Sequence, residues 1–233
     1  MPTSTRALPF VLLGAFTILV AGGVALSLSS AQPLAEEQLR MAAQTTMSAS
    51  GFILKDINSV TTVTSPGASA AGGAPVGTVA FLVVYQAPTS VEETEVDRNG
   101  GNASVIVVGD RGFRKTGSQW TELAATTGLG ARAVGTIMSP LRGAAGATGV
   151  SRRGDRYRFS PADLHQLLRT VLGVTTSRLS SPQLTAVVRD GAVTGEVITA
   201  VVGRQRLEVD LAFSAIGSAP PVKAPRSFVA AAG

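Results

Sequence analysis

Few side chains in this chain could do chemistry, and they are scattered. His165 is the only histidine and cysteine is absent, so thiolate catalysis, disulfides and cysteine-based zinc sites are excluded. His165 has no second histidine to share a metal ion and no evident acidic partner, which indicates a surface or boundary residue. No serine lies in a G-x-S-x-G motif, so a nucleophile elbow is absent as well.

Two further patterns bear only a superficial likeness to binding sites. Gly128-Leu129-Gly130 and the segment 143–149 are rich in glycine, but both lack the G-x-G-x-x-G spacing of a phosphate loop. The other pattern is an acidic strand with Glu92, Glu93, Glu95 and Asp97. Because side chains alternate along a strand, these carboxylates would lie on both faces of the sheet, and we interpret the strand as an edge strand. This favours a solvated edge over a cation site. We therefore expect no enzyme, no cofactor and no metal.

The net charge is +5, but the basic residues are dispersed. The densest cluster runs from Arg152 to Arg158 and is typical of a solvated strand pair or turn. A nucleic-acid partner is not expected. A basic surface that faces anionic lipid headgroups fits a membrane-tethered domain better.

The N-terminus predicts contact with a membrane. No ionisable side chain occurs between Arg6 and Glu36, and a helix from Ala7 to Leu28 would be about 33 Å long, which matches the hydrocarbon core of a bilayer. Positive charge on the short leading side keeps that side in the cytoplasm and places the rest outside it. The small residues Ser29 and Ala31 also fit a signal-peptidase site before Gln32, so a retained anchor and a cleaved signal peptide both remain open.

Residues 1–33 are thus assigned to a signal peptide or membrane anchor, and 34–233 to one extracytoplasmic domain. A helix is predicted over Leu34–Met47, then an extended segment over Ser48–Thr64 and a flexible loop over 65–77. Turn residues separate the predicted strands of an antiparallel meander and of a second set near the C-terminus. These strands are Thr78–Tyr85, Ser90–Val96, Ser104–Val108, Gly112–Lys115, Gln183–Arg189, Val193–Val202 and Arg204–Ser214.

Two helices interrupt the strands. Val134, Ile137, Met138 and Leu141 follow the helical period, and so do Leu164, Leu167, Leu168, Val171 and Leu172. For the second helix we predict Ser160 as N-cap and Pro161 as the first helical residue. Both apolar stripes should lie on one face of the sheet, so the fold class is α+β.

Several short motifs resemble those of the LolA-like superfamily. They are Tyr85-Gln86-Ala87-Pro88 before a strand, the strand Ser104–Val108 with the Gly117-Ser118-Gln119-Trp120 turn, and Phe213–Gly217 leading to Pro221 and Pro225. The ending is similar to that of its actinobacterial LppX/LprG-type members. The resemblance covers most of 34–228. It departs from the lipoprotein members in lacking a lipobox cysteine and in the loop from Ser65 to Pro75, which looks inserted.

The resemblance implies a curved, incomplete barrel of antiparallel strands, with helices on its concave face and a hydrophobic cavity for acyl chains between them. The aliphatic residues of the strands and helices are then the candidate lining: Val79, Phe81, Val83, Ile137, Met138, Leu164, Leu168, Val209 and Leu211. The same residues would equally make an ordinary dry core.

Two functions remain at this point. The leading hypothesis is a non-catalytic binding or carrier domain for a lipid or acylated molecule in the bacterial cell envelope. The alternative is a membrane-anchored regulatory or sensor domain that binds a signalling membrane protein, because relatives of this fold act in that way. An enzyme is not expected, since no catalytic constellation supports one.

Overall fold

A computed structural model describes residues 34–62, 75–96, 103–124, 126–172 and 179–231. They belong to the unit Pro33–Gly233, which contains the whole sheet and both hydrophobic clusters and therefore folds as a unit of its own. The predicted signal peptide or anchor, 1–33, lies outside the described residues. None of the described helices has the length and apolar character needed to cross a bilayer.

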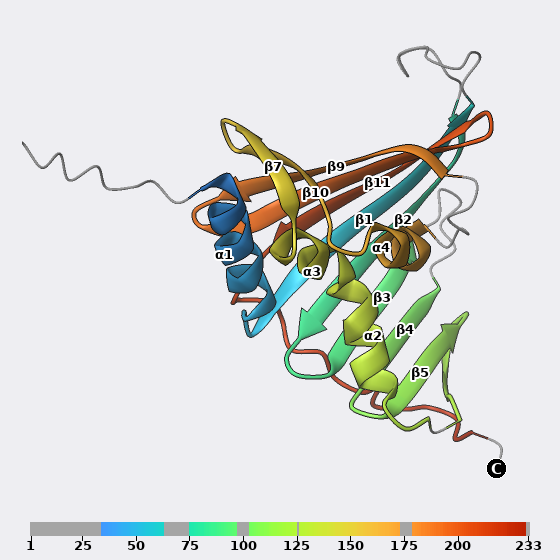
Figure 1. Cartoon of the computed structure of the whole chain (residues 1–233). Helices are drawn as coiled ribbons and strands as arrows, with labels where there is room; N and C mark the ends of the chain where they lie inside the picture. The colour runs from blue at the N-terminus through green and yellow to red at the C-terminus, as the bar shows by residue number, and fades with distance from the viewer. Residues whose placement is uncertain (1–33, 63–74, 97–102, 125, 173–178, 232–233) are drawn as a thin grey trace, which may run out of the picture. The chain divides into compact units, whose positions relative to one another are not determined.

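The described strands form one antiparallel sheet of 11 strands in the order β6-β5-β4-β3-β2-β1-β11-β10-β9-β8-β7 (Figure 1). The strands are β1 (Gly51–Thr62), β2 (Pro75–Gln86), β3 (Ser90–Val96), β4 (Ser104–Val108), β5 (Arg111–Thr116), β6 (Gln119–Glu122), β7 (Thr148–Arg153), β8 (Arg156–Ser160), β9 (Leu179–Arg189), β10 (Ala192–Val202) and β11 (Gln205–Ser214). The meanders β1–β6 and β7–β11 join where β1 pairs with β11. The two predicted strand sets are therefore halves of one sheet.

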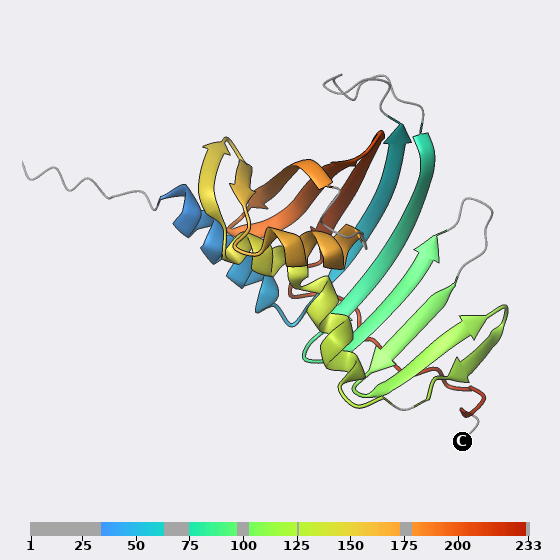
Figure 2. The same ribbon diagram turned by 45° about the vertical axis from the view of Figure 1, so that its right-hand side comes forward.

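Four helices occur in the described part of the chain: α1 (Ala35–Met47), α2 (Leu129–Ile137), α3 (Ser139–Ala145) and α4 (Leu164–Leu172). All four lie on the same side of the curved sheet, inside its curve (Figure 2). We call this side the inner face and the opposite side the outer face. The predicted α+β class, an open and curved antiparallel sheet with helices on one side, is confirmed.

Helix α1 shows how the sequence places a helix on the sheet. Glu36 and Glu37 lie in its first turn, where the helix dipole favours negative charge. Its buried stripe is Leu39, Ala42, Ala43 and Thr46. The small alanines let the helix approach β10, where the Thr46 hydroxyl accepts a hydrogen bond from the Val193 backbone N–H at 2.9 Å. Helix α1 is thus fixed to the sheet by packing and by a buried polar contact.

The predicted helices differ from the observed ones at two points. The stripe from Val134 to Leu141 is divided into α2 and α3, because Pro140 has no N–H and its ring disfavours a continuous helix. The second predicted helix begins at Leu164 rather than at Pro161. Ser160 ends β8, and the Asp163 carboxylate accepts the Gln166 N–H at 2.9 Å, so Asp163 takes the capping role predicted for Ser160.

Three predictions about strands need correction. Strand β2 begins at Pro75, so 75–77 are strand rather than loop, while 63–74 lie outside the described residues. The segment 119–122, interpreted as part of a turn, forms β6. Strand β3 lies between β2 and β4 and is therefore not an edge strand. Its carboxylates consequently project from an internal strand, on the inner and outer faces in turn.

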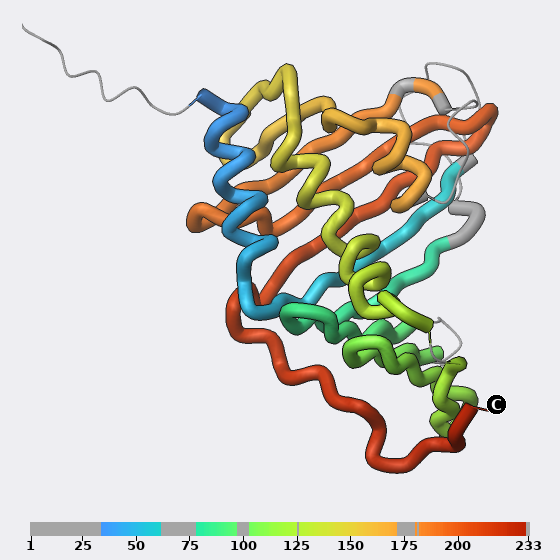
Figure 3. The backbone as a smooth tube through the Cα atoms, turned by 60° about the horizontal axis from the view of Figure 1, so that its bottom comes forward, coloured from blue at the N-terminus to red at the C-terminus, as the bar shows by residue number. Residues whose placement is uncertain are grey.

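The segment after β11 covers the outer face of the β1–β6 half, as the red part of the tube in Figure 3 shows. Its Val222 packs with Ile106 and Phe113, and its backbone N–H donates to the Gln86 side chain at 3.0 Å. Farther along, Val229 exchanges backbone hydrogen bonds with β6, at 2.8 and 2.9 Å. The C-terminal segment therefore supplies the outer apolar layer of this half.

Candidate functional site

A cavity of about 230 Å³ lies between the inner face and the helices. Strands β1, β2, β3 and β11 form its floor, and α2, α3 and α4 contribute its roof. The lining residues are Leu54, Asp56, Asn58, Phe81, Val83, Glu93, Thr136, Ile137, Pro140, Thr170, Val171 and Leu211. We call it the inner-face cavity. Seven of these twelve residues are apolar and five are polar, and a largely apolar lining with a few polar groups is usual for a site that binds an apolar ligand.

Strand register brings the floor residues together. Leu54 lies opposite Val83 in the β1–β2 pair, and Asp56 lies opposite Phe81. On the other side of β1, Asp56 lies opposite Leu211 of β11. Because directly opposite residues in an antiparallel pair share a face, these side chains form one continuous inner surface.

Helix α2 is held over this surface by a close approach at Gly130. A Cβ atom at this position would lie 2.7 Å from the Thr89 carbonyl oxygen and would also meet that of Gly109. Only glycine therefore lets the first turn of α2 rest on the turns between β2 and β3 and between β4 and β5. The approach positions Thr136 and Ile137, one to two helical turns later, over the cavity.

Two carboxyl groups interrupt the apolar lining. Burial raises the pKa of Asp56 to about 6, and the nearby Glu93 and Asp210 add to the rise, while the Asn58 amide that donates to Asp56 at 3.1 Å opposes it. Burial also raises the pKa of Glu93, with a further contribution from Glu95. Glu93 remains partly open to solvent, so it marks the rim of the cavity.

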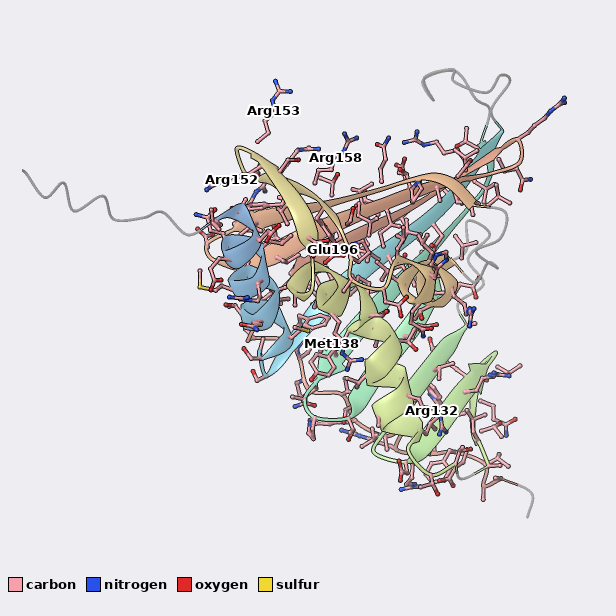
Figure 4. All side chains as sticks on the ribbon, in the orientation of Figure 1. Arg132, Met138, Arg152, Arg153, Arg158 and Glu196 are labelled. Carbon is pink, nitrogen blue, oxygen red and sulfur yellow. The ribbon has the colours of Figure 1, made fainter. Side chains whose placement is uncertain are left out.

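A second depression, a groove of about 550 Å³, lies among α2, α3 and α4. Arg132, Arg142 and Asp163 are its charged lining residues. Thr136 and Thr170 line both this groove and the inner-face cavity. The two spaces are thus neighbours, separated in part by these two small side chains. Figure 4 labels Arg132 on α2 and Met138 at the joint between α2 and α3.

The structure brings some of the predicted lining residues together. Phe81, Val83, Ile137 and Leu211 line the inner-face cavity. Met138, Leu168 and Val209 are buried in the main hydrophobic cluster, with Leu164 packed against it, and none of the four lines the cavity. Val79 lies opposite the lining residue Asn58 but is 40% exposed, so it stands beyond the cavity toward solvent.

The sequence interpretation missed the polar lining and a buried acid outside it. Glu196 of β10, labelled in Figure 4, is 1% exposed, and neither of its carboxyl oxygens has a hydrogen-bond partner in the described part of the chain. Burial raises its pKa to about 8, so it is largely protonated at neutral pH. Asp56 and Glu196 both lie on the inner face of the sheet, because each lies opposite Leu211 in its strand pair, and this pairing joins segments that are distant in the sequence. The sequence interpretation places Glu93 on a solvated edge strand, whereas β3 lies inside the sheet and Glu93 lines the cavity.

Catalytic groups do not converge at either depression. His165 is exposed on α4 and lines neither space. The described residues include no cluster of three or more histidine, aspartate or glutamate side chains that could hold a metal ion. The arrangement offers shape, apolar surface and hydrogen-bond acceptors, which are the means of binding.

Three solved structures are similar to this chain to different degrees. The Mycobacterium tuberculosis lipoprotein LppX is 14% identical, with 82% of this chain and 100% of LppX covered and a TM-score of 0.50. LprF from Mycobacterium bovis is 12% identical, with 84% and 97% covered and a TM-score of 0.50. A LolA superfamily protein from Nitrosomonas europaea is 10% identical, with 77% and 92% covered and a TM-score of 0.34.

The chain therefore has the fold found in LppX and LprF. The resemblance noted in the sequence is confirmed at the level of the fold. No family model matches the chain, and no curated protein matches it by sequence.

Proposed function

We propose that this chain is a non-catalytic, extracytoplasmic domain that binds or carries a lipid or acylated molecule in the cell envelope. The inner-face cavity is the observation that supports this proposal. A mostly apolar space between a sheet and its helices can accept an acyl chain, and each buried methylene contributes about 0.8 kcal/mol before the cost of ordering the chain.

In this proposal Phe81, Val83, Ile137 and Leu211 contact the ligand directly. Met138, Leu164, Leu168 and Val209 support the surface from behind, and Val79 stands near the entrance. Thr136 and Thr170 stand between the cavity and the groove among the helices. A small displacement of either side chain would connect the two spaces and give the ligand a path between them. The fold shared with the lipoprotein LppX agrees with a role in the envelope.

The segment 1–33 carries the domain across the cytoplasmic membrane in this proposal. A reporter active only outside the cytoplasm, fused after Gly233, is expected to give signal. A stable but silent fusion would contradict the location. N-terminal sequencing of the mature protein distinguishes a cleaved signal from a retained anchor, since cleavage would leave Gln32 as the first residue.

The ligand is tested by purifying the full chain, extracting it with organic solvent and measuring lipid by mass spectrometry. Val83→Trp should fill the cavity and lower the lipid-to-protein ratio at least about tenfold, because Val83 is buried in the lining. Leu82→Trp is the matched control, since Leu82 is the next residue of the same strand and points to the exposed outer face.

Equal lipid in both variants would show that the extracted lipid is not held in the cavity. If the wild type carries no lipid and Val83→Trp unfolds, the site is a packed core. The regulatory alternative, a domain that binds a signalling membrane protein, would then take precedence.

A further inference from the structure

The polar lining of the inner-face cavity consists of Asp56, Asn58, Glu93, Thr136 and Thr170, and no described lining residue is lysine, arginine or histidine. Neither Asp56 nor Glu93 forms an ion pair among the residues that the structure describes. Within the described part of the chain, the Asp56 side chain accepts one hydrogen bond, from the Asn58 amide. The cavity therefore presents acceptor oxygens without a compensating cation.

Acceptor oxygens in an apolar cavity discriminate strongly between ligands. An ionised carboxylate accepts hydrogen bonds and cannot donate them, so a second anion beside it meets repulsion that the low local dielectric screens poorly. A donor in the same place satisfies the free oxygens, and a cation does so with a charge-assisted bond. The pKa of Asp56 is raised for the same reason: burial and the neighbouring acids already disfavour a negative charge at this position.

We propose that the inner-face cavity takes an amphiphile whose polar group is a hydrogen-bond donor, an ammonium or a hydroxyl, and that it rejects free carboxylates and phosphates. The donor sits between Asp56 and the rim residue Glu93, and the apolar chain lies against Leu54, Val83 and Ile137. This inference rests on the proposed function and specifies its ligand.

Three matched probes test the inference: dodecylamine, dodecanol and dodecanoate. The unit Pro33–Gly233 is titrated with each at neutral pH and below its micelle concentration, with binding measured by displacement of a fluorescent apolar dye. The amine should bind at least about tenfold more tightly than the carboxylate, with the alcohol in between. The order of amine and alcohol shows whether charge or hydrogen bonding dominates.

The double variant Asp56→Asn, Glu93→Gln keeps the shape of the cavity and removes both ionisable groups. Amine affinity should fall about tenfold and carboxylate affinity should rise. Glu92→Gln is the control, because Glu92 lies opposite Val84 and Ile106 on the outer face of the same strand and should change nothing. Circular dichroism verifies that each variant is folded.

The outcomes separate this inference from the proposed function. Equal affinity for the three probes, tighter binding of dodecanoate, or a preference that the double variant retains would overturn the inference and leave the carrier function standing. No binding of any probe by the folded wild type would contradict the carrier function, and the inference with it.

Discussion

Two neighbouring regions of the inner face have similar ingredients and opposite properties. Leu211 separates them: Asp56 lies opposite it on β1, and Glu196 lies opposite it on β10. Around Glu196 the helices cover the sheet closely, and we call this the sealed region. Around Asp56 they leave the inner-face cavity, and we call this the open region.

The difference lies in the helices rather than in the strands. Helix α1 presents alanine to the sheet and is bonded to Val193 through Thr46, so it packs closely against β10. Helices α2 and α4 span the open region with Thr136 and Thr170, whose short side chains leave space. The comparison indicates that the sealed region is closely packed and contributes to stability, whereas the open region leaves free space.

The largest expected effect comes from one substitution that disrupts the packing of both regions. Leu168 of α4 is 2% exposed within the main hydrophobic cluster, and the same helix roofs the cavity. Leu168→Asp removes a buried side chain and inserts an unpartnered carboxyl, for a combined cost on the order of 6 kcal/mol. Thermal unfolding should show loss of the folded state. Arg169→Ala, on the exposed side of α4, should stay within about 0.5 kcal/mol, and similar effects of both changes would contradict the packing of α4.

The acid of the sealed region makes stability depend on pH. The Glu196 pKa is raised from 4.5 to about 8 by burial, so the folded chain binds its proton more tightly than the unfolded chain. Glu196 makes its full contribution to the free energy of unfolding below about pH 4.5. The contribution decreases as the pH rises toward 8 and is absent above it, a total loss on the order of 5 kcal/mol.

Glu196→Gln removes this dependence. The variant should match the wild type in urea unfolding near pH 4.5 and exceed it by several kcal/mol near pH 9. Glu208→Gln, on the outer face of β11, should have little effect at either pH. If the stability of the wild type does not decrease from the lower to the higher pH, Glu196 is not buried as described.

A matched pair of substitutions tests whether the two regions differ in free space. Ala186→Phe places a ring beside Glu196, where the residue is fully buried, and should cost about 3 kcal/mol through overpacking. Val83→Phe projects into the cavity and should cost less than about 1.5 kcal/mol. Equal costs in denaturant titrations would remove the distinction between sealed and open.

The smallest effect concerns the bond that fixes α1. Thr46→Val keeps the shape of the side chain but leaves the Val193 N–H without its acceptor, at a cost of about 1 to 2 kcal/mol. Thr45→Val is the control, because Thr45 is exposed and its hydroxyl only donates to the Met41 carbonyl within the helix. Hydrogen exchange at the Val193 amide should speed up in Thr46→Val alone.

Local patterns predicted much of this architecture. The apolar stripe of α1 and the alternation of Leu207, Val209, Leu211 and Phe213 require only neighbouring residues, and both elements are found where expected. The division at Pro140 was also present in the sequence, but the apolar spacing on both sides of it concealed the break.

The site was harder to predict, because it depends on register between distant strands. Nothing near Asp56 in the sequence indicates that Phe81 and Leu211 flank it. Nor does the acidic run of β3 indicate that β4 pairs with its other edge and that Glu93 lies at the rim of the cavity. The periodicity of apolar residues predicted part of the apolar lining, whereas the polar lining could be located only from the strand pairing of the folded chain.

The pairing of β1 with β11 has a consequence for biosynthesis. The Ser214 hydroxyl bonds the Ile53 carbonyl across 161 residues, and closing a loop of that length costs about 4.5 kcal/mol in chain entropy. Until the last strand has been synthesised, the centre of the sheet lacks one of its members and β1 exposes an unpaired edge. Such long-range pairing makes folding slow. The contact that completes the sheet therefore forms only after translation is nearly finished.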